Sequence, residues 1–233
     1  EMTSNIFINN SFDNCQIKTV NFTGSEIFSC LFNSAQVSDC DFTRAVIMPY
    51  RISEETRLRF EKIIENRDTT LGEDQRHKVP GDEICNFTNS FMMACLYTDA
   101  IVKYSDFTYA ILQRSVVSNT IYENCLFDYG SLMEMYFADS IIDRCSFRFS
   151  NLTNSNITSC IFEKCRFDSS SLSMVTITDS SFIGCTFDNV DVTELKLIDT
   201  SWENVELGEI LDFFVKNPGS FIKITIKEGN TYH

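Results

Sequence analysis

Ten cysteine thiols are the side chains with the most chemistry to offer in this chain. Thiolates bind zinc, form disulfides and act as nucleophiles, but each use needs a particular spacing or partner. Every cysteine here falls on a multiple of five, no two form a CxxC pair, and the only histidines are His77 and His233. This spacing favours a structural role, with the thiols as small buried side chains that stay unbridged and react slowly. The cysteines are Cys15, Cys30, Cys40, Cys85, Cys95, Cys125, Cys145, Cys160, Cys165 and Cys185.

No other group of residues has the spacing of an active site. Neither histidine has a suitably spaced serine or cysteine for a nucleophilic dyad, and there is no glycine-rich phosphate loop. The 33 aspartates and glutamates are numerous enough for carboxylates to lie close together by chance. We therefore predict no catalytic residue, no cofactor site and no metal site in this segment. So many unbridged thiols also fit a reducing compartment.

A period of five residues must position these side chains. Apolar residues recur at every fifth position from Phe7 to Ile47 and again from Phe87 to Leu207, and small residues, the cysteines among them, stand two positions earlier. A five-residue period fits neither an α-helix nor a strand, whose periods are about 3.6 and 2. It requires a coil that turns a corner every five residues.

A second period of twenty residues gives this coil four sides. Positions 87, 107, 127, 147, 167 and 187 are all phenylalanine, and positions 112, 132, 152 and 172 are all leucine. Residues twenty apart therefore occupy the same side of successive coils and stack at about 4.8 Å, like neighbouring strands. The sequence predicts a rod whose interior is filled by ladders of identical side chains.

The pattern resembles the pentapeptide-repeat family, whose unit is a small residue, Asn or Asp, Leu or Phe, and two outward residues. Residues 40–44 (CDFTR) and 105–109 (SDFTY) match that unit, whereas others depart from it at the second position, as at Leu126. The resemblance covers about residues 5–47 and 83–209. It implies an all-β fold, a right-handed quadrilateral β-helix, with a helical insertion and a C-terminal capping helix as additions.

The period divides the chain into four segments: two with repeats, one that interrupts them and one that follows them. We expect first coils of a pentapeptide-repeat β-helix at 1–47, a helix and loop insertion at 48–84, main coils at 85–207, and a capping helix and strand leading to a missing domain at 208–233.

Local signals support the two non-repeat segments. Ser53 can cap a helix that starts at Glu54, and residues 221–227 alternate like a strand. The apolar positions Ile47 and Phe87 are forty residues apart, so we expect the rod to resume after the insertion in the same coil register.

Some outward positions combine aromatic and basic residues, which contribute most to protein interfaces. Tyr109, Tyr129 and Phe149 are spaced by twenty and should form an exposed aromatic column. The basic residues Arg148, Arg166, Arg144 and Lys164 should lie near it, with the acidic column Glu123, Asp143 and Glu163 beside them as a charge ladder. The aromatic and basic residues are our predicted protein-binding site, although a purely structural surface ladder would have the same spacing. An outward residue such as Asp128 should contribute little to stability.

Two functions remain open. The Phe- and Cys-rich repeats with a helical insertion resemble the N-terminal β-helix of bacterial HECT-like E3 ubiquitin ligase effectors. That resemblance implies a type III effector, secreted by bacteria into the reducing host-cell cytoplasm, with transferase activity in another domain. This segment would be a non-enzymatic, monomeric domain that recruits a host protein, such as a component of the ubiquitination machinery.

The alternative is an acidic DNA mimic, because other members of the pentapeptide-repeat family resemble a B-DNA rod and bind gyrase. The net charge of −14 fits mimicry and disfavours binding to nucleic acid or to an anionic membrane. The basic cluster around Arg144 argues against mimicry, since a mimic needs continuous negative charge.

Overall fold

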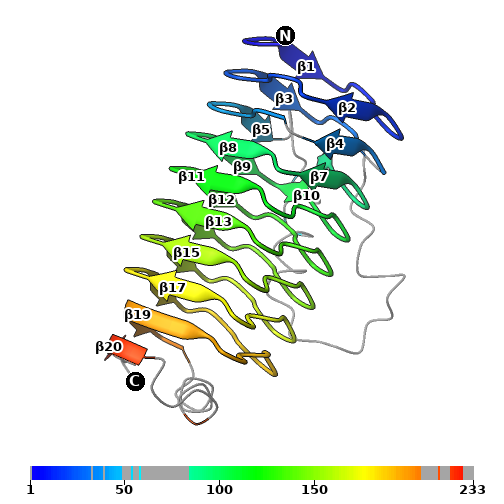
Figure 1. Cartoon of the computed structure of the whole chain (residues 1–233). Helices are drawn as coiled ribbons and strands as arrows, with labels where there is room; N and C mark the ends of the chain where they lie inside the picture. Colours follow the sequence, from blue (N-terminus) through cyan, green and yellow to red (C-terminus); the bar gives the residue numbers. More distant parts are fainter. Residues whose placement is uncertain are drawn as a thin grey trace.

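The repeats fold into a parallel β-solenoid in which each twenty-residue coil has four sides (Figure 1). The computed structural model describes residues 2–32, 34–38, 40–48, 54, 58, 84–205, 215 and 221–227. Each side is a short stretch of extended chain, and equivalent sides of successive coils pair in parallel at a register of twenty residues, as between Val117 and Phe137. The all-β rod predicted from the sequence is therefore confirmed.

Two of the four sides hold most of the regular strands. We call the sides A, B, C and D in the order in which a coil passes through them. Side C holds β8 (Leu96–Thr98), β11 (Val116–Ser118), β13 (Tyr136–Ala138), β15 (Asn156–Thr158) and β17 (Thr176–Thr178). Side D holds β1 (Ile6–Ile8), β3 (Glu26–Phe28), β5 (Val46–Met48), β9 (Ile101–Lys103), β12 (Ile121–Glu123), β14 (Ile141–Asp143), β16 (Ile161–Glu163) and β18 (Ser181–Ile183).

Sides A and B pair through shorter strands and single bridges. Side A holds β6 (Cys85–Asn86) and β10 (Ser105–Asp106), and side B holds β2 (Gln16–Lys18), β4 (Gln36–Ser38) and β7 (Phe91–Met93). Single parallel bridges continue both sides down the rod, for example from Leu126 to Ser146 on side A. The eight-residue strand β19 (Lys196–Glu203) runs from side C into side D and joins their strands into one sheet.

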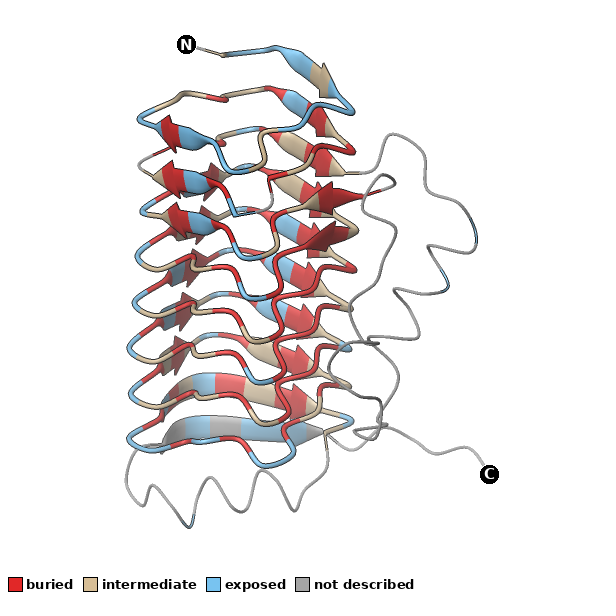
Figure 2. Cartoon of the chain, turned by 90° about the vertical axis from the view of Figure 1, so that its right-hand side faces the viewer, coloured by how far each residue is buried: buried red, intermediate tan, exposed pale blue. Residues whose placement is uncertain are grey.

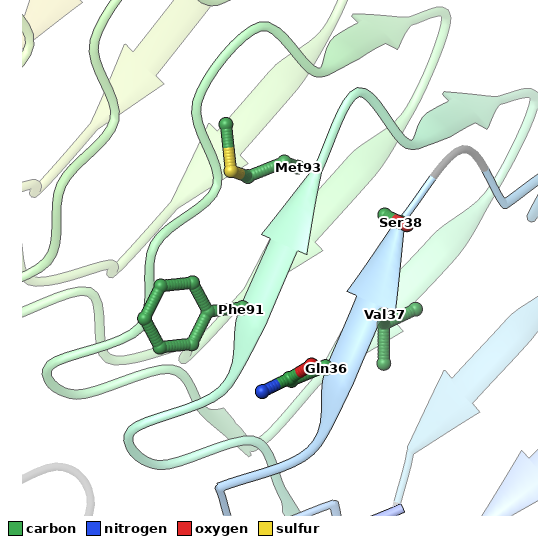
Figure 3. Close-up of a pocket in the computed structure, with 5 residues that line it drawn as sticks. All are labelled: Gln36, Val37, Ser38, Phe91 and Met93. Atoms are coloured by element: carbon green, nitrogen blue, oxygen red, sulfur yellow. The ribbon is translucent and has the colours of Figure 1, made fainter. Parts of the chain in front are cut away.

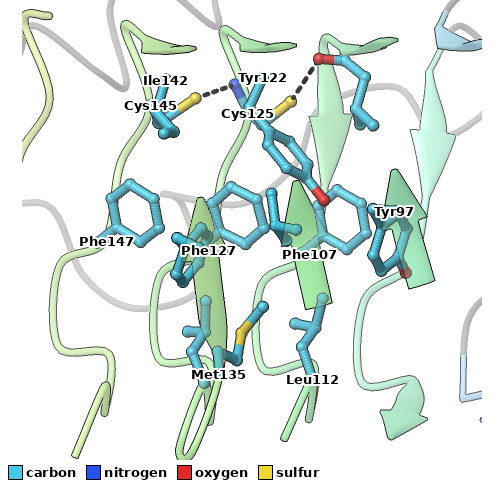
Figure 4. Close-up of a cluster of buried hydrophobic side chains, with 14 of the residues drawn as sticks. Tyr97, Phe107, Leu112, Tyr122, Cys125, Phe127, Met135, Ile142, Cys145 and Phe147 are labelled. Carbon is cyan, nitrogen blue, oxygen red and sulfur yellow. Dashed lines mark hydrogen bonds between the residues drawn. The ribbon is translucent and has the colours of Figure 1, made fainter. Parts of the chain in front are cut away.

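The interior is filled by the side chains at the centre of each side. Phe107, Phe127 and Phe147 of side A stack nearly parallel, with ring centroids 4.9–5.0 Å apart (Figure 4). Aromatic rings of side D, such as Tyr122, meet this ladder edge-on at 5.4 Å. Burying one such ring contributes roughly 1.5–3 kcal/mol, so the ladders account for much of the rod's stability. Along the three-residue strands, such as β12, the buried centre is flanked by more exposed residues (Figure 2).

The small inward residue of several units ties its coil to the preceding one. Where it is cysteine, serine or threonine, its side chain can donate a hydrogen bond to a carbonyl oxygen twenty-three residues earlier, although some, such as Cys160, donate to one two residues earlier. Cys165 Sγ lies 3.2 Å from the oxygen of Ile142, and Ser155 Oγ lies 2.9 Å from that of Leu132. Cysteine, serine and threonine can all make this bond within the space of a small side chain, which explains why the cysteines fall on multiples of five.

Each corner is a residue in the left-handed helical region of backbone space. The φ angles of Tyr109, Arg114 and Asn119, for example, lie between 49° and 60°. The turn is closed locally, as where the amide of Ala110 donates to the carbonyl of Phe107 at 2.9 Å. Asn and Asp tolerate this conformation, whereas larger side chains enter it at a cost. A bulky residue at a corner therefore calls for an explanation.

The insertion changes the coil register, so that expectation was wrong. Phe87 stacks on Phe32, with centroids 4.7 Å apart, and Ile47 pairs with Val102, fifty-five positions later instead of twenty. The chain therefore leaves the rod after side D and re-enters on side A, the side that would have followed anyway. The pairing of Ile47 with Val102 spans thirty-five residues more than one coil. Thirty-five is a multiple of five but not of twenty. The five-residue period therefore continues across the insertion, whereas the twenty-residue register shifts by one side of the coil.

The other non-repeat segments are described in part. Glu54 and Leu58, in the predicted insertion helix, and Val215, in the predicted capping helix, are helical; the rest of both helices and the 66–83 loop lie outside the described residues. Strand β20 (Phe221–Lys227) forms where expected and pairs with β19, so it extends the sheet of the rod. Within the described ranges no helix could span a membrane.

Candidate protein-binding face

Three outward aromatic rings form a continuous stack at the corner between sides A and B. The ring centroids of Tyr109 and Tyr129 are 4.9 Å apart, and those of Tyr129 and Phe149 are 4.8 Å apart, with interplanar angles of 19° and 7°. Tyr109 is 41% exposed and Phe149 is 37% exposed. We call these three residues the aromatic stack. It is a rigid apolar surface on the outside of the rod.

The aromatic stack occupies backbone positions that disfavour aromatic residues. All three residues have φ angles of 58–59°, in the left-handed region, where bulky side chains are uncommon. The same corner column holds Asn89 before the stack and Ser169 after it, both small and polar. Within this column the three rings are therefore a local exception, although other corners of the rod hold large residues such as Tyr104, Arg114 and Met174.

Arg148 points outward as predicted but is not available to a partner. It is 7% exposed, and its Nη2 and Nε atoms lie 2.7 and 3.1 Å from Oδ2 of Asp128, one coil away. Asp128 is itself fully buried and also accepts hydrogen bonds from the hydroxyl of Ser146 and the amide of Arg148. The expectation that Asp128 contributes little was therefore wrong, because it holds a buried guanidinium.

Arg166 is engaged in a similar way. It is 7% exposed, and its Nη2 atom lies 2.7 Å from Oδ2 of Asp168 on the same side of the same coil. Two arginines predicted at the binding surface thus form buried ion pairs on side A. Such a pair contributes little net stability when intact, but removing one partner is costly.

Arg144 and Lys164 lie at the corner between sides D and A, across side A from the aromatic stack. Arg144 Nη2 bridges Glu123 and Asp143 at 2.8 Å each, and Lys164 Nζ lies 2.9 Å from Glu163. The acidic column and these bases form the charge ladder that the sequence indicates. Partial burial, and then the neighbouring Glu163 and Glu123, raise the pKa of Asp143, while Arg144 lowers it.

The predicted site residues therefore separate into three groups. The aromatic stack is exposed at one edge of side A, Arg144 and Lys164 lie partly exposed at the other edge, and Arg148 and Arg166 lie buried between them. A partner that reaches the aromatic stack meets rings without a free guanidinium from Arg148. Sequence spacing identifies the side of each residue but not its exposure.

Side A also holds a buried carboxyl that the sequence analysis missed. Asp106 is 2% exposed, and its Oδ1 atom accepts a hydrogen bond from the amide of Thr108 at 2.9 Å. Burial raises the pKa of Asp106 to about 6, and the nearby Asp128 adds to the shift. Its only sequence signal is the second position of a repeat, which it shares with many exposed residues.

The thiols show no catalytic arrangement. The structure leaves all ten unbridged, nine of them buried, and burial raises the pKa of Cys85 to about 12 and that of Cys160 to about 11. Cys15 is exposed, which corrects the expectation that every thiol is inside. Across the described part of the chain, no group of His, Cys, Asp and Glu is arranged to hold a metal ion.

A shallow hollow on side B was also absent from the sequence analysis. Phe91 and Met93 project from β7 beside Gln36 and Ser38 of β4 (Figure 3). Phe91 is largely exposed, so the hollow has an apolar rim. It lies where β4 pairs with β7 across the change of coil register, and that pairing could not be read from the sequence.

Comparisons with known proteins agree with this architecture. A family model described as pentapeptide repeats matches residues 131–168, in eight copies. A solved structure of trypsin-treated QnrB1, a plasmid-mediated fluoroquinolone resistance protein, is similar at 16% identity and a TM-score of 0.52, over 98% of this chain and 91% of that one. HetL from Nostoc sp. strain PCC 7120, a pentapeptide repeat protein involved in heterocyst differentiation regulation, is similar at 9% identity and a TM-score of 0.49, over 95% and 88%.

No curated protein sequence matches the chain. The likeness to QnrB1, at 16% identity, shows the fold alone. Residues 131–168 match the pentapeptide-repeat model, and the four-sided coil extends the same five-residue architecture through the other described repeats.

Proposed function

We propose that this chain is a protein-recognition module that binds its partner through the aromatic stack of Tyr109, Tyr129 and Phe149. The observation that carries the proposal is a stack of three outward rings at corner positions that disfavour aromatic residues, with Tyr109 and Phe149 exposed and Tyr129 partly buried between them. Aromatic side chains contribute most per residue to protein interfaces once they are desolvated. The cost of placing them at these corners is offset if a partner uses them.

The scaffold suits this use. The rings belong to coils whose backbones are hydrogen-bonded on both sides, as where the amide of Tyr129 donates to the carbonyl of Arg148 at 2.9 Å. A surface fixed in this way loses little conformational entropy on binding. Each ring also packs against its neighbour, so the apolar surface has one shape before and after association.

Affinity capture followed by a binding measurement tests this proposal. Partners would be captured on the wild-type chain from host-cell lysate, purified, and titrated against the double variant Tyr129→Ala with Phe149→Ala. We expect the dissociation constant to rise at least tenfold, about 1.4 kcal/mol. The control is Tyr136→Ala, a tyrosine on side C that is 44% exposed, which should bind normally. Normal binding by the double variant would show that the aromatic stack is not the contact.

We further propose that the module recruits host proteins for a secreted bacterial HECT-like E3 ubiquitin ligase. The support is the resemblance of the Phe- and Cys-rich repeats and their insertion to that group of effectors. The free thiols fit the reducing host cytoplasm in which such a ligase acts. In this arrangement the catalytic cysteine belongs to another domain, and the β-helix contributes substrate choice.

The division of labour has its own test. The chain mixed with E1, E2 and ubiquitin should form no thioester, because nine thiols are buried in the rod; the variant Cys15→Ser controls for the exposed thiol. A reducing-agent-sensitive ubiquitin adduct on the wild-type chain that persists in Cys15→Ser would overturn the assignment.

One observation favours a different function, mimicry of DNA. The net charge of −14 on a rod suits binding to a DNA-processing enzyme such as gyrase. The charge ladder weakens this idea, because Lys103, Arg144 and Lys164 pair with the acidic column on side D. Competition between the chain and duplex DNA for purified gyrase separates the two functions, since only a mimic displaces the DNA.

A further inference from the structure

Side D carries a second apolar surface, far from the aromatic stack. The residue that precedes each buried centre on this side is isoleucine in four successive coils. The four lie in register on neighbouring strands, and three of them are 37–45% exposed. We call this set the isoleucine ladder: Ile101, Ile121, Ile141 and Ile161.

The isoleucine ladder is not a general feature of that position in the repeat. In the same four coils the equivalent residues are Phe91, Ile111, Ser131 and Asn151 on side B, and Leu96, Val116, Tyr136 and Asn156 on side C. β-Propensity favours isoleucine on every side of the coil to the same degree. The unbroken run of four isoleucines on side D, where sides B and C change to polar residues, therefore points to a use of that side's surface.

Acidic residues border the isoleucine ladder at the corner between sides C and D. A shallow groove is lined by Ile101, Ile121 and Ile141 on one side and by Asp99, Asn119 and Asp139 on the other, and Arg44 also lines it. Asp99 is 4.0 Å from Arg44, whereas Asp139 has no ion pair with any residue that the structure describes. On the far side of the ladder, the acidic column is neutralised by its own bases. The groove therefore holds two carboxylates and one guanidinium, and Asp139 supplies its unpaired negative charge.

The spacing of the isoleucines selects the shape of an occupant. Four rungs at about 4.8 Å place the isoleucines at about 0, 5, 10 and 14 Å along the rod. Residues i, i+3, i+7 and i+10 of an α-helix lie on one face at about 0, 4.5, 10.5 and 15 Å. Same-face residues of an extended strand repeat every 6.7 Å or so, and are roughly 6 Å out of step by the fourth rung. A helix parallel to the rod axis fits, and a strand does not.

We propose that the isoleucine ladder and its acidic corner form a docking face for an amphipathic, basic helix of a partner protein. The apolar face of the helix covers the ladder, and its basic residues meet Asp99 and Asp139. The corner between sides C and D lies diagonally opposite the corner that bears the aromatic stack. The rod can therefore hold two partners at once, and this face is independent of the one assigned above.

A designed peptide tests the face directly. The probe is an eighteen-residue helical peptide with leucines at i, i+3, i+7 and i+10 and lysines beside them, labelled for fluorescence anisotropy. One control peptide has the same composition in a shuffled order, and another has glutamate in place of lysine. We expect the probe to bind the wild-type chain at least tenfold more tightly than either control peptide. Equal binding of the shuffled peptide would reduce the effect to nonspecific charge attraction and overturn the proposal, as would no binding of the probe.

Matched variants locate the binding site. Ile121→Thr with Ile141→Thr keeps the β-branched side chains that suit a strand but removes apolar surface, and should weaken probe binding at least tenfold. Leu96→Thr with Tyr136→Thr, an equally exposed pair on side C, should change it less than twofold. Circular dichroism melts confirm that both variants fold. Equal loss in the two variants would place the site elsewhere.

Two further variants separate this proposal from the aromatic stack. Asp139→Asn should weaken binding of the lysine probe about threefold, and added salt should reduce the difference from wild type. Tyr129→Ala with Phe149→Ala should leave probe binding unchanged. If that double variant abolished probe binding, the peptide would be binding to the aromatic stack, and the isoleucine ladder would have no docking role.

Discussion

Two aromatic ladders run down the same coils with nearly the same geometry and different surroundings. The inner phenylalanines, such as Phe127 and Phe147, stack at 4.9 Å, and the outer rings Tyr129 and Phe149 stack at 4.8 Å. Both spacings come from the backbone, because any two residues twenty apart are one strand spacing apart. Stacking alone is therefore no evidence of function. The two ladders differ in solvent exposure and in the backbone conformation of their residues, and these differences point to binding at the outer one.

The largest expected effect separates the two ladders by stability. Phe127→Ala leaves a cavity in the inner ladder and should lower the free energy of unfolding by about 3–5 kcal/mol. Tyr129→Ala, two residues later but outside the rod, should lower it by less than about 1 kcal/mol. Urea denaturation followed by circular dichroism measures both. Losses of similar size would mean that the outer rings are part of the structural core.

The next comparison is between Asp128 and Asp188, two aspartates at the same outward position of side A. Asp128→Ala leaves the buried guanidinium of Arg148 without its ion-pair partner and should lower the free energy of unfolding by about 3 kcal/mol. Asp188, three coils along the same column, is exposed, and Asp188→Ala should change stability by less than about 0.5 kcal/mol. Equal effects in the same denaturation assay would show that the ion pair on side A does not set the difference.

Asp106 makes the stability of side A depend on pH. Its pKa is raised by burial to about 6, above the value of about 3.9 expected when unfolded, so folding favours the protonated form. Its contribution is fully present below pH 4 and is lost as the pH rises through 6, by roughly 2–3 kcal/mol. Asp106→Asn should remove this loss, since the amide stays neutral and its Oδ1 can still accept from Thr108. Unfolding free energies at pH 4, 5, 6 and 7 compare the two proteins, and parallel curves would contradict the assignment.

The rod could be predicted from the sequence because two periods constrain it independently. A residue such as Phe127 is fixed as inward by the period of five and placed on its ladder by the period of twenty. The coil register after the insertion could not be predicted in this way. All four sides share the five-residue phase, so the spacing of Ile47 and Phe87 does not say which side the chain re-enters.

The candidate site was predicted less completely, for two physical reasons. The repeat gives the direction of a side chain but not its solvent exposure, so Arg148 and Tyr129 were assigned to one surface although only the rings are accessible. Aromatic and basic side chains are also the types that a sequence marks as interface residues. The isoleucines of side D have the same twenty-residue spacing, but isoleucine is an ordinary strand residue and gives no such signal.

The smallest expected effect on stability compares two cysteines of the small inward position. Cys15 is exposed, whereas Cys145 is buried between Cys125 and Cys165. A thiol reagent should label one cysteine of the native protein quickly and the other nine only as fast as the rod opens. Cys15→Ser should remove the fast phase and change the free energy of unfolding by less than about 0.5 kcal/mol. Because burial raises the pKa of Cys145 well above its usual range, that thiol should stay unlabelled even at pH 9. Fast labelling of Cys145 in the native protein would mean that the column of inward cysteines becomes accessible to solvent without unfolding of the rod. Inner and outer cysteines would then differ only in how fast they react.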